Sequence, residues 1–96
     1  MRLIVRPLAA EDIERAAHWY EGQAQRLGEE FLDVLGRRLA DIVAAPERFP
    51  RVSARLRRAM LNRFPYAVFF TVTDDTIQVV ACMHGRRHPA RWLRRG

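Results

Sequence analysis

The sequence predicts a small α+β domain in which a hairpin of two helices packs on one face of a mainly antiparallel, four-stranded sheet. Two observations carry this prediction. Apolar residues recur at helical spacing from residue 9 to residue 43, and from residue 55 onward the spacing changes to alternation. A short apolar stretch before Pro7 adds a first strand, so the expected order is β-α-α-β-β-β. We expect a chain of 96 residues to form one domain, 1–96.

The first two expected elements are a short strand and a long helix. Residues 2–6 form the strand, which Pro7 ends because proline lacks a backbone N–H. Residues 9–24 form the helix, and Asp12 lies with two other acidic residues in its early turns, where negative charge suits the helix dipole. Trp19 is expected in the core beside this face. The apolar face consists of Ala9, Ile13, Ala16, Ala17, Tyr20 and Ala24.

The second helix is expected to open at Gly28 and to stop at Pro46. Glu29 and Glu30 lie in its first turn, where negative charge again suits the helix dipole. The short link between the two helices predicts an αα-hairpin, whose apolar stripes must be buried against the sheet. The stripe of the second helix consists of Phe31, Leu32, Leu35, Leu39, Ile42 and Val43.

Three strands form the remaining sheet as a meander. Residues 55–60 alternate, residues 62–65 form a turn, and residues 66–73 are apolar on both alternating sets, which is typical of a central strand covered on both faces. A turn at residues 74–75 leads to the last strand, residues 76–84. Four apolar residues of this last strand are expected to face one way: Ile77, Val79, Ala81 and Met83.

Positive charge is concentrated in the second half of the chain. All 17 basic residues are arginines, and the net charge is +6. Residues 1–54 carry eight arginines and nine acidic residues, whereas residues 55–96 carry nine arginines and two acidic residues. A solvated surface usually mixes both signs, so this imbalance favours a binding face for nucleic acid or an acidic protein segment. The candidate residues are Arg57, Arg58, Arg63, Arg86, Arg87 and Arg91.

Several classes of protein and of site are excluded or disfavoured. A single cysteine, Cys82, cannot form a disulfide within the chain and fits a reducing compartment as an inert buried thiol. No apolar run of about 18 residues predicts a membrane helix, and the N-terminal apolar stretch is too short for a signal peptide, so we expect a cytoplasmic protein with no membrane partner. His84 and His88 flank a glycine turn rather than sharing a helix face. We therefore expect no metal and no cofactor.

Four motifs, spread over nearly the whole chain, carry a resemblance to a known family. They are VRPLA at 5–9, the proline-ended helix exit at 42–50, the pair Arg57-Arg58 followed by FPYAVFF at 64–70, and IQVVACMHGRRHP at 77–89 before Trp92. In order and spacing they resemble the RelE/ParE superfamily of type II toxins, also called plasmid-stabilisation proteins. The last motif is similar to the closing block of ParE-like members.

The resemblance implies a toxin that a co-expressed antitoxin neutralises by laying an extended or helical segment along it. The seam between the helix hairpin and the sheet edge is one place that an antitoxin helix could occupy. A toxin–antitoxin hetero-oligomer is one form that this pairing can take. ParE-type members poison DNA gyrase, whereas RelE-type members cut mRNA on the ribosome, and one fold hosts both activities. A third alternative is a non-toxic regulatory member that only binds an antitoxin.

Catalysis would need a base, an acid and a cation at the scissile phosphate. The candidates for proton transfer are His84 and His88. The candidates for the cation are Arg57, Arg58, Arg63, Arg86 and Arg87. His84 fits a strand-end residue bonded to a backbone carbonyl equally well. Lysine is absent, and the tyrosines fit the core or a groove. Over the nuclease hypothesis, we therefore favour the ParE-like hypothesis, in which no catalytic residues are expected. Its expected binding residues are the six arginines named above together with Trp92, which fits either the core or a partner interface.

Overall fold

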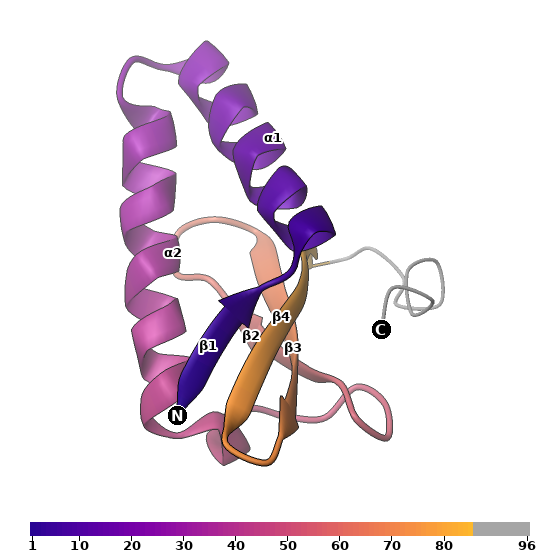
Figure 1. The fold of residues 1–96 in the computed structure, drawn as a ribbon. Coiled ribbons are helices and arrows are strands. Elements are labelled where there is room, and N and C mark those ends of the chain that lie inside the picture. Colours follow the sequence, from indigo (N-terminus) through magenta and orange to yellow (C-terminus); the bar gives the residue numbers. More distant parts are fainter. Residues whose placement is uncertain (86–96) are drawn as a thin grey trace.

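The structure is a computed structural model that describes residues 1–85. The elements follow the predicted β-α-α-β-β-β order (Figure 1). They are β1 (Arg2–Val5), α1 (Pro7–Gln23), α2 (Leu27–Ala44), the 3-10 turn η1 (Pro46–Arg48), β2 (Arg57–Met60), β3 (Tyr66–Thr73) and β4 (Thr76–His84). The bounds of β3 and β4 are those expected from the sequence, and α1 begins two residues earlier, at Pro7, because proline suits the first turn of a helix.

The four strands form one mixed sheet in the order β1-β4-β3-β2. Strands β2, β3 and β4 are antiparallel neighbours, and β1 pairs in parallel with β4, so the sheet is mainly antiparallel as predicted. A parallel pair needs a long crossover, which the helix hairpin and the meander supply. The strand at the start of the chain therefore lies beside the last strand.

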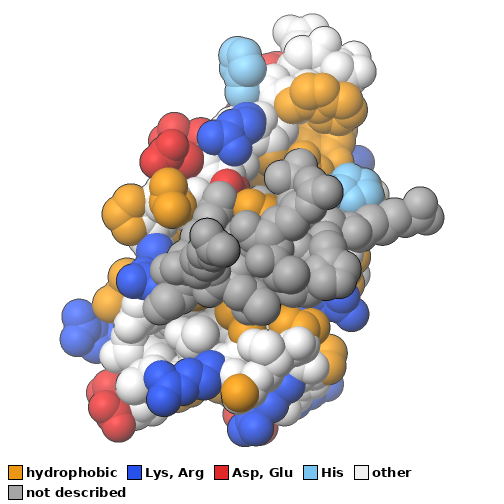
Figure 2. Space-filling view, turned by 90° about the vertical axis from the view of Figure 1, so that its right-hand side faces the viewer, with side chains coloured by type: hydrophobic (Ala, Val, Ile, Leu, Met, Phe, Trp, Pro, Cys, Tyr) orange, Lys and Arg blue, Asp and Glu red, His pale blue; other side chains and the backbone are white. Residues whose placement is uncertain are grey.

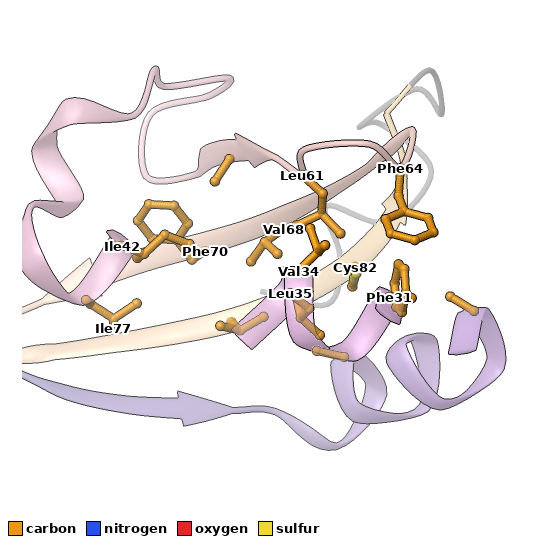
Figure 3. Packing of buried hydrophobic residues seen from close by; sticks show 14 of the residues in the cluster. Phe31, Val34, Leu35, Ile42, Leu61, Phe64, Val68, Phe70, Ile77 and Cys82 are labelled. Atoms are coloured by element: carbon orange, nitrogen blue, oxygen red, sulfur yellow. The ribbon is translucent and has the colours of Figure 1, made fainter. Parts of the chain in front are cut away.

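The helix hairpin covers one face of the sheet (Figure 1). Phe31, Val34, Leu35 and Ile42 of α2 meet the strand residues of the main core, as Figure 3 shows. Leu32 was expected in this stripe but is 45% exposed, whereas Val34 is buried. Helical spacing defines an apolar stripe, but the turn between β2 and β3 decides which edge of that stripe is covered. No helix in the described part of the chain is long and apolar enough to cross a membrane.

The face of the sheet away from the helices, here called the helix-free face, has an apolar cluster of its own. Val52 packs against this cluster from the loop before β2. Strand β3 is therefore buried on both faces, as its composition predicted. The members of the cluster are Leu56, Ala67, Phe69, Val80, Ala81 and Met83.

A β-bulge reverses the alternation within β4. Phe69 pairs with Ala81 and Phe70 pairs with Val79, so Val80 is one extra residue on this strand. The prediction that Ile77, Val79, Ala81 and Met83 face one way is therefore wrong. Ile77 and Val79 belong to the main core, and Ala81 and Met83 belong to the helix-free cluster. The same reversal turns Cys82 toward the helices.

Candidate functional site

Arg57, at the start of β2, points toward the helix side of the sheet. It alternates with Arg58 and shares its side with Ala59, a member of the main core. Its Nη1 donates a hydrogen bond of 2.6 Å to the carbonyl oxygen of Phe49 and one of 3.4 Å to that of Glu47. This guanidinium therefore holds the segment that follows α2 against the sheet.

Arg58 points to the opposite side, onto the helix-free face. It pairs with Phe69 across the β2–β3 ladder, so its side chain lies beside the apolar cluster of that face. The side chain is half-buried, and its Nε is fully covered and has no hydrogen-bond partner among residues 1–85. The two adjacent arginines that the sequence suggested as one binding patch are thus separated by the sheet.

Arg63 lies in the turn between β2 and β3, in the left-handed region at φ 69°. Its Nη2 is 2.9 Å from Oε1 of Glu30 on α2, and its guanidinium carbon lies 5.2 Å from the ring centre of Phe64. Both charged side chains are about half exposed, so the pair adds little stability. The guanidinium nonetheless already has a carboxylate partner within the chain.

His84 ends β4 and is exposed, with its ring centre 5.9 Å from that of Tyr66. It pairs with Tyr66 of β3, whereas Arg57 pairs with Phe70, four residues farther along the same strand. Four strand residues span about 14 Å. Arg57 and His84 are therefore not brought together. Arg86, Arg87, His88, Arg91 and Trp92 lie outside the described residues.

Asp12, whose charge the sequence suggested would suit the helix dipole, is a structural residue. It is only 5% exposed, and its Oδ2 accepts a 3.0 Å hydrogen bond from the backbone N–H of Cys82. Strand β1 pairs with β4 only as far as Val79, so the carboxylate takes over from β1 as a partner of the β4 backbone. The spacing in the sequence indicates this burial, because position 12 lies three residues after Ala9 and four before Ala16 on the buried stripe.

The thiol of Cys82 lies beside this carboxylate. Burial, and to a lesser extent the negative charge of Asp12, together raise the pKa of Cys82 from 9.0 to about 12. The thiol therefore stays protonated at neutral pH and is a poor nucleophile. Within residues 1–85, no three side chains of the His, Cys, Asp or Glu type are grouped so that they could hold a metal ion.

A groove of about 250 Å³ runs between α1 and the ends of β3 and β4. Trp19 was expected in the core but is 56% exposed on the wall of this groove. Its indole meets Tyr20 edge to face at 5.1 Å, and Tyr20 in turn stacks on Phe31 at 5.3 Å, so Tyr20 takes the core position. The other lining residues are Asp12, Arg15, Ala16, Tyr66, Cys82 and Met83.

Comparison with known proteins identifies the family to which this fold belongs. A family model described as "ParE toxin of type II toxin-antitoxin system, parDE" matches residues 3–89. No curated protein sequence matches the chain. Among solved structures, the fold is similar to a chain of the "Chromosomal ParDE TA system from P. aeruginosa", with a TM-score of 0.72 and 19% identity over 88% of this chain and 95% of that chain. The family match spans most of the sequence and confirms the resemblance: the chain belongs to the ParE toxin family of type II toxin–antitoxin systems, within the RelE/ParE superfamily.

Proposed function

We propose that this ParE-family toxin inhibits growth by binding DNA gyrase and has no chemistry of its own. The observation that supports this proposal is the separation of His84 from Arg57, whose guanidinium is occupied by backbone carbonyls. A nuclease needs its proton-transfer group and its cation at one phosphate, whereas a toxin that acts by binding needs only a complementary surface.

We further propose that a cognate antitoxin neutralises the toxin. The ParDE system of P. aeruginosa is the precedent for a paired partner. The groove beside α1 supports this part of the proposal, because an exposed tryptophan on an apolar wall is typical of a protein interface. An amphipathic antitoxin segment that covers Trp19 would fit this groove.

The test is induced expression of the chain alone in a bacterial host, with DNA and protein synthesis followed by pulse labelling. We expect DNA synthesis to fall first, and we expect purified gyrase to lose supercoiling activity at micromolar concentrations of toxin. Co-expression of the antitoxin should restore both. The variant His84→Ala should arrest growth as strongly as wild type, and His18→Ala, another exposed histidine, is its matched control.

Two results would overturn the proposal. One is an early loss of protein synthesis that His84→Ala abolishes and His18→Ala does not, which would establish mRNA cleavage instead. The other is harmless expression of the chain in the absence of any antitoxin, which would establish a regulatory member that has lost its toxicity.

A further inference from the structure

Arg58 differs from the other arginines of the β2 region in being half-buried with no partner for its side chain among the described residues. Arg57 is held by backbone carbonyls, Arg63 pairs with Glu30, and Arg38 donates to Asp41 and Asn62. Within residues 1–85, neither a hydrogen bond nor an ion pair engages the guanidinium of Arg58, and its Nε is fully covered. Because arginine cannot release its proton, the half-buried charge stays positive, and no group in the described part of the chain compensates it.

The surroundings of Arg58 are apolar. The side chain lies opposite Phe69 and next to Leu56 in the helix-free cluster, and Met60, two residues away on the same side of β2, is 43% exposed. Residues 48–73 contain no acidic residue. The carboxylate of Asp74 follows the far end of β3, about 17 Å along the strand from the position paired with Arg58. Figure 2 shows arginine and hydrophobic side chains as neighbours on the side of the molecule opposite α2.

We propose that Arg58 anchors a carboxylate carried by an otherwise apolar segment of the antitoxin. This inference rests on the proposed function, since it assigns the antitoxin a contact on the toxin. The guanidinium would bind the carboxylate through two parallel N–H donors, which is the strongest geometry for this pair. Apolar residues on either side of that carboxylate would pack on Met60, whose flexible thioether adapts to a partner.

A carboxylate fits this site better than a phosphate chain does. Nucleic-acid binding draws on several phosphate contacts at once. Strands β2, β3 and β4 carry only two arginines, and the sheet places Arg57 on the other face. One charge in an apolar setting matches an acidic residue flanked by apolar ones, and arginines in such settings are frequent hot spots of protein interfaces.

The test uses the full chain and the antitoxin, defined as the product of the neighbouring short reading frame whose co-expression relieves growth arrest. Overlapping synthetic peptides of that antitoxin are titrated against wild type, Arg58→Met, Arg58→Lys and Arg55→Met by fluorescence anisotropy. Arg55 is an exposed arginine of the preceding loop, so its variant removes the same charge elsewhere. Thermal unfolding of each variant is measured in parallel.

We expect one acidic–apolar peptide to lose affinity on the order of 30-fold or more with Arg58→Met. Arg55→Met should bind it nearly as wild type does, and Arg58→Lys should lie between, because lysine keeps the charge but loses the fork. Replacing the critical Glu or Asp of the peptide by its amide should weaken binding to wild type and leave binding to Arg58→Met unchanged. The Tm of Arg58→Met should be equal to or above that of wild type, because an uncompensated charge is removed.

Equal affinities of Arg58→Met and Arg55→Met would overturn the inference, since only overall charge would then matter. A lower Tm of Arg58→Met would also overturn it, because the guanidinium would then have a partner within the chain. Loss of single-stranded RNA binding by Arg58→Met, with peptide binding intact, would assign the site to nucleic acid instead. These outcomes are independent of gyrase inhibition and growth arrest, which test the proposed function itself.

Discussion

Asp12 is the residue whose role differs most from its sequence interpretation. Its carboxylate ties α1 to β4 through the Cys82 N–H, at a place where β1 no longer pairs with that strand. Buried polar groups are satisfied in stable proteins, and removal of one partner leaves the other without a hydrogen bond. The residue is thus a structural link between elements that lie far apart in the sequence.

We predict that Asp12→Ala lowers the free energy of unfolding by about 1–3 kcal/mol. The physical reason is the loss of the acceptor for the buried Cys82 N–H, and Asp12→Asn should cost less because its amide oxygen can still accept that bond. Urea denaturation measures both values. Glu14→Ala, an exposed acid on the same helix, is the control and should change stability by no more than about 0.5 kcal/mol. Equal losses for Asp12→Ala and Glu14→Ala would contradict the structural role of Asp12.

The thiol of Cys82 makes a prediction about alkaline pH. In the unfolded chain the thiol releases its proton near pH 9.0, whereas in the folded chain burial and then Asp12 raise its pKa to about 12. The folded state therefore binds more protons between these two values, and its stability falls as the pH rises from 9 toward 12. The loss from this group reaches about 4 kcal/mol at the upper end, as an order of magnitude.

Chemical denaturation of wild type and Cys82→Ala at several alkaline pH values measures this contribution. All other titratable groups are present in both proteins, so the difference between the two slopes isolates the thiol. We expect the slope of wild type to be the steeper one. Parallel slopes would show that the native thiol ionises as freely as the unfolded one.

At the scale of elements, the close approach of the two helices depends on one glycine. A Cβ at Gly28 would stand 2.5 Å from the carbonyl oxygen of Ala17 and 3.1 Å from Glu21. The carboxylate of Glu21 also accepts hydrogen bonds of 2.9 Å from the backbone N–H groups of Arg26 and Gly28, which satisfies donors at the start of α2. The end of α1 thus both touches and caps α2.

We predict that Gly28→Ala destabilises the protein by about 1–3 kcal/mol, because the added methyl group meets a backbone atom that cannot move independently. Gly36→Ala is the matched control on the same helix. Nothing lies within 4 Å of a Cβ at Gly36, so its replacement should stabilise the protein by about 0.5–1 kcal/mol through helix propensity. Thermal or urea unfolding measures the change in stability of each variant. A loss of stability in both variants would contradict the contact argument.

At the scale of the whole molecule, the sheet separates two adjacent arginines, Arg57 and Arg58. The helix side uses Arg57 to hold the chain together, and the helix-free face presents Arg58 beside apolar side chains. Strand β1 does not pair with the end of β4, so α1 packs beside that end instead. The groove with Trp19 lies where α1 and β4 meet. The two surfaces proposed to meet the antitoxin are therefore on different parts of the fold.

The sequence by itself determined the order of the elements, the ends of β3 and β4, the two-sided burial of β3 and the family. These features follow from local periodicity, from prolines and turn residues, and from motif order, all of which are encoded within short windows of the chain. The αα-hairpin and its burial on the sheet were likewise predictable, because two amphipathic helices need one apolar surface.

Only the tertiary structure decided where individual side chains point and which partners they have. The bulge at Val80 turns Cys82 toward the helices, the end of β1 makes Asp12 a partner of β4, and strand register places Arg57 and Arg58 on opposite faces. Each of these outcomes depends on contacts between segments far apart in the sequence. Local spacing carries no information on such contacts, since a shift of one residue along a strand exchanges the two faces.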